Sequence, residues 1–125
     1  TQKVVAHVLD QIDYDAHLEN VRKVYKSKCD AMMRVFKEKG SSKIHLTEPT
    51  GGMFAWMTMP DTVDCDEFFE TCMNKNVGII KCGAFASDGV ENGHAFRLSY
   101  TVPTIPEIEK GMEILCALTK EYCGE

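Results

Sequence analysis

Concentrated positive charge is the first thing that this sequence lacks. Its 125 residues carry 14 lysines and arginines against 19 acidic residues, for a formal net charge of −5. Only three residues are arginines, namely Arg22, Arg34 and Arg97. Binding to nucleic-acid phosphates needs clustered basic side chains, so a nucleic-acid partner is not expected. No apolar run approaches the ~20 residues of a membrane helix, and no signal peptide is visible, so no membrane partner is expected.

The sequence also lacks the spacings that bind metals or build a nucleophile–base pair. No C-x-x-C motif occurs, the four histidines are scattered, and no metal site or catalytic residue is predicted. The cysteines are Cys29, Cys65, Cys72, Cys82, Cys116 and Cys123. Their surroundings are rich in core-forming residues, which favours reduced and mostly buried thiols over a disulfide framework. Reduced thiols indicate a cytoplasmic protein.

The length and composition predict one soluble globular domain. Hydrophobic residues make up 44% of the chain and charged residues 26%, values that are ordinary for such a domain. The sequence begins at Thr1 without an initiator methionine, which suggests a fragment or a processed segment. Residues 3–12 are amphipathic and are interpreted as the end of a helix whose beginning is missing.

A long amphipathic helix is predicted over residues 16–39. Its apolar positions are separated by steps of three or four residues, which is typical of one helical face: Leu18, Val21, Tyr25, Cys29, Met32 and Phe36. Asp13 and Asp15 suit its start, and Gly40 suits its end. A helix of roughly 25 residues spans about 37 Å. That length suggests a helix that connects this domain to something else.

The stretch from Pro49 to Met59 is predicted to be the central strand. Gly51-Gly52 provides a flexible corner, and the apolar run that follows contains the only tryptophan, Trp56. Further short strands are expected at 43–47 and 77–81, and residues 95–101 alternate as a half-buried strand does. Residues 82–94 are predicted to form a loop.

Two more helices complete the pattern. Asp64 with Glu67 forms a capping box before a helix that ends near Asn76, and its expected buried residues are Phe68, Phe69, Cys72 and Met73. Thr104 with Glu107 opens the last helix, and its expected buried side is Ile108, Met112, Leu115, Cys116 and Thr119. The order helix, strand, strand, helix, strand, strand, helix predicts a two-layer α+β sandwich in which a small sheet is packed by helices.

Arg97 and Phe85 are the two candidate site residues. Arg97 occupies the strand face opposite Phe96 and Leu98, and a guanidinium there offers a planar fork for a carboxylate. From the pattern alone, a surface or internal ion pair is the simpler explanation of Arg97. Phe85 either covers a pocket or anchors its loop to the core.

The motifs in combination resemble the C-terminal small domain of class I/II (fold-type I) aminotransferases, which use pyridoxal phosphate (PLP). The resemblance rests on Pro49 with Gly51-Gly52-Met53-Phe54 and Trp56, on Val77-Gly78-Ile79-Ile80 with Gly83 and Phe85, and on Phe96-Arg97-Leu98-Ser99-Tyr100. Tyr14-Asp15 with His17-Leu18 and Val21-Arg22 resembles the start of that family's interdomain helix. The similarity covers nearly all of the chain and is greatest for the branch that includes kynurenine and 2-aminoadipate aminotransferases.

The resemblance implies specific roles. Arg97 matches the arginine that binds the substrate α-carboxylate, and Phe85 matches an aromatic residue near the substrate entrance. The family usually has Pro-Gly where this chain has Cys82-Gly83, which puts the loop geometry in question. Residues 1–12 would end the connection to a large domain, 13–40 would form the interdomain helix, and 41–125 would form the small domain.

The family's PLP-binding lysine belongs to the large domain, so the resemblance implies that this chain alone binds no PLP and is inactive. The parent enzyme would be a homodimer that transfers amino groups between amino acids and 2-oxo acids. The alternative is an aminotransferase-like effector-binding domain of a transcription regulator.

Overall fold

The computed structural model describes residues 1–87 and 93–125. Its helices are α1 (Gln2–Gln11), α2 (Tyr14–Lys39), α3 (Cys65–Asn74), the 3₁₀-helix η1 (Cys82–Phe85) and α4 (Ile105–Cys123). Its strands are β1 (His45–Leu46), β2 (Phe54–Thr58), β3 (Ile80–Lys81) and β4 (Ala95–Ser99). The predicted order of elements is confirmed, although β1 and β3 are shorter than expected.

The four strands form one antiparallel sheet in the order β1-β2-β4-β3. The predicted central strand, β2, is therefore an interior strand. In the β2–β4 register Trp56 lies opposite Arg97, and in the β3–β4 register Ile80 lies opposite Arg97 from the other side. Arg97 thus occupies the middle of a cross-strand row.

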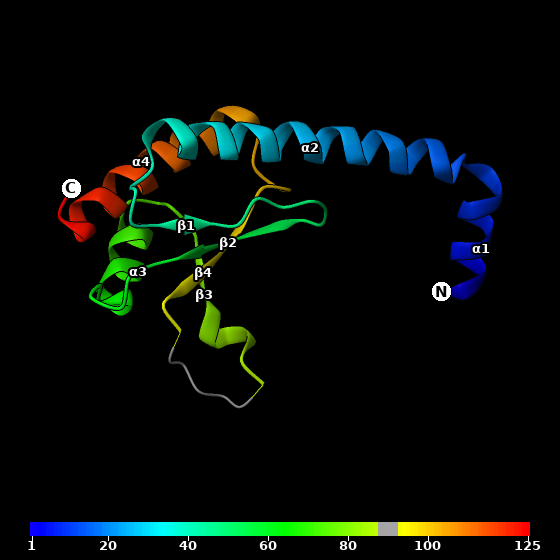
Figure 1. The fold of residues 1–125 in the computed structure, drawn as a ribbon. Helices are drawn as coiled ribbons and strands as arrows, with labels where there is room; N and C mark the ends of the chain where they lie inside the picture. Colours follow the sequence, from blue (N-terminus) through cyan, green and yellow to red (C-terminus); the bar gives the residue numbers. More distant parts are fainter. Residues whose placement is uncertain (88–92) are drawn as a thin grey trace.

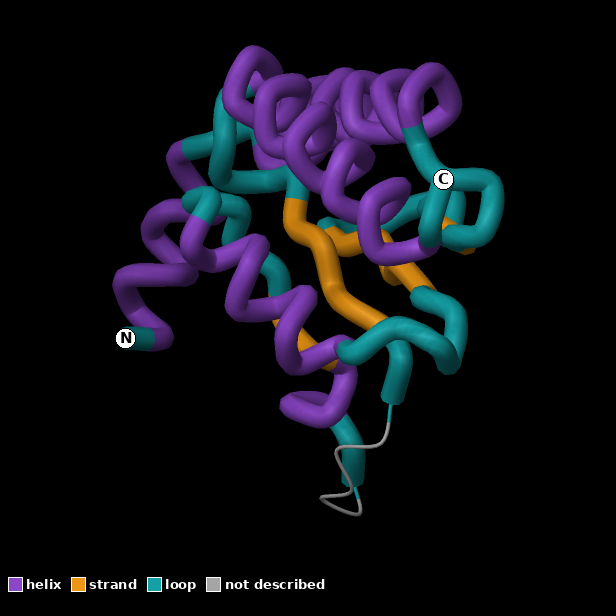
Figure 2. The backbone as a smooth tube through the Cα atoms, turned by 90° about the vertical axis from the view of Figure 1, so that its left-hand side faces the viewer, coloured by secondary structure: helices purple, strands orange, loops and turns teal. Residues whose placement is uncertain are grey.

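Three helices cover one face of the sheet. Figures 1 and 2 show α2 and α4 side by side over the strands, with α3 beside the sheet. The ring of Phe68, on α3, lies 5.4 Å from Phe96 of β4 and 5.3 Å from Tyr122 of α4, measured between ring centroids. The α3 helix therefore packs into the same core as α4. The predicted two-layer α+β sandwich is confirmed.

The α2 helix is only partly covered by the core. Asp13 caps its start by accepting from the Ala16 backbone N–H at 3.0 Å, and Gly40 ends it with extended backbone. Its buried residues all lie in its C-terminal half: Ala31, Met32, Met33 and Val35. Of the predicted apolar stripe only Met32 is buried. Figure 1 shows the reason, since the N-terminal half of α2 extends past the sheet towards α1.

The predicted helix starts of α3 and α4 are confirmed, but of the four residues expected to be buried on α3 only Phe68 and Cys72 are buried, and Phe69 is half-buried. The Asp64 carboxylate accepts from the backbone N–H groups of Asp66 and Glu67, and the Thr104–Glu107 capping box is complete. The five residues expected to be buried on α4 are all buried. Met73, in contrast, is 47% exposed.

All six cysteines are free thiols, but only Cys72 and Cys116 are buried. The expectation of mostly buried thiols is therefore wrong for the other four, which are half-buried. Within residues 1–87 and 93–125, no helix is long and apolar enough to cross a membrane.

Candidate functional site

Arg97 lies on the sheet face that the three helices leave open. Along β4, Phe96 and Leu98 are 0% and 4% exposed and point towards the helices. Because successive side chains of a strand alternate between faces, Arg97 points the other way. Its cross-strand neighbours Trp56 and Ile80 share that face with it.

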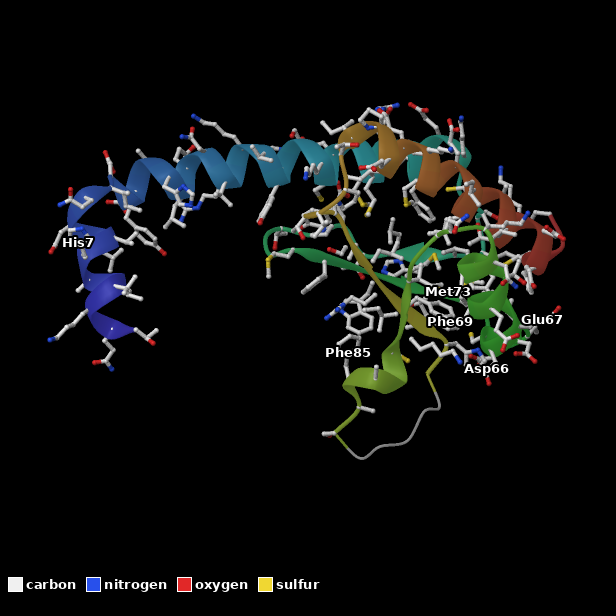
Figure 3. The ribbon with its side chains drawn as sticks, turned by 180° about the vertical axis from the view of Figure 1, so that it is seen from behind. His7, Asp66, Glu67, Phe69, Met73 and Phe85 are labelled. Atoms are coloured by element: carbon white, nitrogen blue, oxygen red, sulfur yellow. The ribbon has the colours of Figure 1, made fainter. Side chains whose placement is uncertain are left out.

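Two aromatic rings enclose the guanidinium of Arg97. Its Cζ atom lies 4.0 Å from the ring centroid of Phe54 and 4.2 Å from that of Phe85. The ring of Trp56 meets Phe85 edge-on, with centroids 5.8 Å apart and planes at 86°. We call Arg97, Phe54, Trp56 and Phe85 the arginine cage. Figure 3 shows Phe85 between η1 and the sheet, on the side away from α4.

The cage leaves the edge of the guanidinium as its polar surface. Rings over a guanidinium interact with its faces, whereas its five N–H donors point outwards in its plane. Arg22 and Arg34 both form ion pairs, with Glu19 at 3.8 Å and with Glu109 respectively. Among the residues that the structure describes, Arg97 forms no ion pair. The arrangement can therefore accept an external planar anion along that edge.

Phe85 is brought to the cage by η1, which follows β3 directly. A Cβ atom on Gly93 would lie 1.8 Å from the Sγ atom of Cys82, so η1 approaches the segment before β4 closely and a larger residue there would displace the Cys82 side chain. Phe85 is 45% exposed and lies outside the core. It therefore does not anchor its loop to the core. Residues 88–92 of the predicted loop lie outside the described residues.

Phe54 and Trp56 were not among the site residues predicted from the sequence, where both count only as members of the apolar central strand. The alternation of side chains in β2 could have indicated them. Ala55 and Met57 are each 1% exposed in the core, so Phe54 and Trp56 point to the open face. The missing information was the pairing of β2 with β4, which brings these rings to Arg97.

The corner before β2 is held by a hydrogen bond from the residue that follows β4. The Tyr100 hydroxyl donates to the backbone oxygen of Gly52 at 2.8 Å. Gly52 has a φ of 84°, in the left-handed region. Burial, together with the neighbouring Cys29 thiol, raises the pKa of Tyr100, so this hydroxyl keeps its proton at neutral pH and can donate the hydrogen bond. The corner is thereby held where β2 begins and Phe54 is placed.

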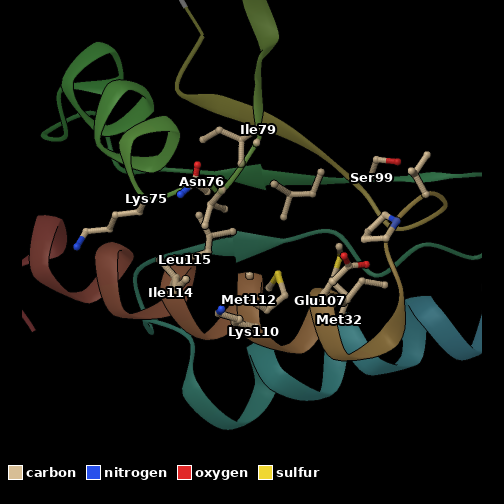
Figure 4. A pocket seen from close by; sticks show the side chains of 17 residues that line it. Met32, Lys75, Asn76, Ile79, Ser99, Glu107, Lys110, Met112, Ile114 and Leu115 are labelled. Carbon is tan, nitrogen blue, oxygen red and sulfur yellow. The ribbon is translucent and has the colours of Figure 1, made fainter.

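A groove of about 720 Å³ lies elsewhere, between α4 and the segment that leads into β3 (Figure 4). Its lining is mainly apolar and includes Val77, Ile79 and Met112. The carboxylate of Glu107, which also lines it, accepts two hydrogen bonds from Thr104 within the capping box. No residue of the arginine cage lines this groove. We therefore place the candidate site at the cage, where cation and aromatic rings converge.

Comparison with known proteins identifies the relatives of this chain. No family model matches it. The 2-aminoadipate transaminase of Thermus thermophilus is 32% identical over 114 residues, covering 90% of this chain and 28% of that protein. The crystal structure of LysN, the α-aminoadipate aminotransferase of Thermus thermophilus complexed with N-(5'-phosphopyridoxyl)-L-leucine, matches with a TM-score of 0.86 and 28% identity, over 95% of this chain and 30% of that chain. The chain is homologous to PLP-dependent aminotransferases.

The resemblance drawn from the sequence motifs is thus confirmed, as is the aminotransferase small-domain fold. A transcription regulator is also similar to this chain. HTH-type transcriptional regulator NorG of Staphylococcus aureus strain USA300 is 30% identical over 114 residues, covering 81% of this chain and 26% of that protein. The chain spans less than a third of the length of each of these relatives.

The residues of the arginine cage do not by themselves fit PLP. Covalent attachment of PLP needs a lysine amine, and the cage contains none. Lys81, which directly precedes η1, pairs with the Asp66 carboxylate at 2.5 Å. Further away, Lys28 Nζ donates to the Thr101 oxygen at 2.6 Å, and Lys43 Nζ to the Cys123 oxygen at 2.5 Å. Within the described residues no group of His, Cys, Asp and Glu could hold a metal ion.

Proposed function

We propose that this chain is the C-terminal small domain of a PLP-dependent aminotransferase, and that it binds the α-carboxylate of the substrate through Arg97. The observation that carries the proposal is the arginine cage, in which the rings of Phe54 and Phe85 both contact the guanidinium, which forms no ion pair within the described residues. A bidentate carboxylate fits such an edge, because two parallel N–H donors match its two oxygens. Phe85 would cover the substrate entrance.

The amino-group chemistry would belong to the rest of the parent protein. The parent would transfer an amino group between an amino acid and a 2-oxo acid, with PLP held by a large domain outside these residues. This chain's part would be to orient the substrate, which raises the effective concentration of the reacting groups. Alone, it would be inactive and bind no PLP.

The exposed apolar residues at the N-terminal end support the proposed domain organisation. Val4, Val5, Val8, Leu9 and Ile12 are between 42% and 66% exposed. Such a face is typical of a surface that a partner covers. We assign residues 1–12 to the end of the large-domain connection, 13–40 to the interdomain helix and 41–125 to the small domain. A homodimeric, cytoplasmic parent stays a prediction.

The decisive experiment replaces Arg97 in the full-length protein. Arg97→Lys keeps the positive charge but removes the fork, so KM for both amino and oxo acids should rise by about 10- to 100-fold, equivalent to the roughly 1.5–3 kcal/mol of a charge-assisted hydrogen bond. Arg34→Lys is the matched control, because Arg34 lies on α2 with a side chain that is 52% exposed and should leave KM unchanged. An unchanged KM in the Arg97→Lys enzyme would contradict the proposal.

The role of the missing large domain has a separate test. Residues 1–125 expressed alone and mixed with PLP should show no imine absorbance beyond that of free lysine side chains, and no transaminase turnover. Stoichiometric imine formation with turnover would show that a lysine of this chain can serve.

A second candidate is supported by the match to NorG. In that case the same cage would bind an amino-acid-like effector, and the parent would carry a DNA-binding region. The two functions differ in the full-length protein: an aminotransferase shows PLP-dependent turnover, whereas a regulator shows effector-dependent DNA binding. The sequence upstream of Thr1 in the parent would decide between them.

A further inference from the structure

We propose that Phe54 is a positioning residue that fixes the plane of the Arg97 guanidinium and so determines how a substrate carboxylate docks. The inference rests on the proposed function of Arg97. Phe54 would act through Arg97 and not on the substrate.

The backbone of β2 places the Phe54 ring under Arg97. In the register, Phe54 lies opposite Ser99, so it is a diagonal neighbour of Arg97 on the same face. Diagonal neighbours are separated by about 7–8 Å, within reach of an aromatic ring and a long side chain. The observed distance of 4.0 Å from Cζ to the ring centroid is that of a close cation–π contact.

Phe54 is the better anchored of the two stacking rings. It is half-buried, and the next residue in its strand, Ala55, is 1% exposed in the core. Phe85, in contrast, comes from the short helix η1 and is 45% exposed. The strand therefore provides a fixed wall on one side of the guanidinium, and η1 provides the other.

This arrangement restricts both the guanidinium and its ligand. An arginine side chain has many rotamers, and losing them on binding weakens the complex. The contacts of the Arg97 guanidinium with Phe54 and Phe85 restrict that freedom before the ligand arrives, which is preorganisation. Because the five N–H donors lie in the guanidinium plane, a carboxylate that accepts two of them lies in that plane too, and the two rings limit where the plane can turn.

The test is a double-mutant cycle in the full-length protein, with steady-state kinetics for the amino-acid and oxo-acid substrates. Phe54→Leu should raise KM roughly 5- to 30-fold, the range expected for loss of a partly desolvated cation–π contact, with a smaller change in kcat. Phe54→Tyr retains the ring and should keep KM within about threefold of wild type. Because Phe54 acts through Arg97, adding Phe54→Leu to Arg97→Lys should raise KM by less than about twofold further.

Phe69→Leu is the matched control. Its ring also lies under a cation, with Lys81 Nζ 5.0 Å from the centroid, but on α3 and away from the cage. The same truncation there should leave KM unchanged. If Phe54→Leu and Arg97→Lys raise KM independently, or if Phe54→Leu has no effect while Arg97→Lys does, the inference is wrong and the proposed function stands. If Arg97→Lys itself has no effect, the proposed function fails.

Discussion

The two faces of the sheet are built from neighbouring residues of the same strands, yet different interactions dominate them. On the covered face Met57, Phe96 and Leu98 are between 0% and 4% exposed and pack beneath the helices. On the open face Phe54 and Phe85 surround a single cation, Arg97. Two adjacent residues of β4 therefore have different environments: Phe96 is fully buried in the core, whereas the cation of Arg97 contacts two aromatic rings.

This difference separates stability from binding. Burying apolar area contributes about 25 cal/mol per Å², so the covered face supplies most of the favourable free energy of folding. A partly exposed cation–π contact contributes about 0.5–1 kcal/mol, which is minor for folding but useful for orienting a charged group. We therefore expect mutations on the covered face to change stability, and mutations on the open face to change ligand binding.

The largest expected contrast is between two adjacent residues of β4. Phe96→Ala leaves a cavity beneath Phe68 and should lower the free energy of unfolding by about 3–5 kcal/mol. Arg97→Ala, which removes a partly exposed side chain, should change it by less than about 1 kcal/mol. Urea unfolding followed by circular dichroism measures both.

The milder substitution Phe96→Leu keeps an apolar group in place, and it replaces Phe96→Ala in the unfolding measurement if the alanine variant does not fold. It should still destabilise the chain more than Arg97→Ala. If the variants at Phe96 and Arg97 lowered the free energy of unfolding equally, the open face would also contribute to folding stability, and the proposed difference between the two faces would be wrong.

A smaller effect is expected from pH, and it too originates on the covered face. Burial raises the pKa of Cys72 from its ordinary value of 9.0 to about 12, and that of Cys116 to about 11. Because both folded-state pKa values are raised, their contribution to stability is complete below pH 9 and is lost as pH rises towards 11–12. Between pH 9 and its own folded-state pKa, each thiol should lower the free energy of unfolding by roughly 1.4 kcal/mol per pH unit.

The measurement is the free energy of unfolding between pH 8 and about 10.5, compared between variants. Cys72→Ala should lower the stability at pH 8 but reduce its fall with rising pH. Met73→Ala, an exposed neighbour on the same helix without a titrating group, should leave the slope unchanged. Identical slopes in all three proteins would contradict a buried, protonated Cys72.

The covered face was largely predictable from the sequence, since it depends on periodicity. The alternation around Arg97 and the buried side of α4 follow from one apolar face per element. The errors arose where tertiary packing decides. Met73 has the spacing of a buried residue but is 47% exposed, and the predicted stripe of α2 continues past the end of the sheet.

The open face could be predicted only in part. Arg97 was identified because a cation that alternates with buried residues is conspicuous, and the family resemblance gave it a role. The contact with Phe54 depends on the register between two strands that are far apart in the sequence. Neither propensity nor periodicity specifies that register, which is set by packing of the covered face.

The smallest effect is expected at the corner that joins the two faces. Gly52→Ala forces a side chain into a left-handed φ of 84° and should cost roughly 1–2 kcal/mol, whereas Gly51→Ala has open space and no positive φ and should be neutral or slightly stabilising. Because Gly52 accepts the hydrogen bond of Tyr100 and leads into Phe54, its variant should also raise KM in the full-length protein. Unfolding and kinetics of this pair test whether the scaffold positions the cage: a loss of stability without a change in KM would show that the two faces are independent.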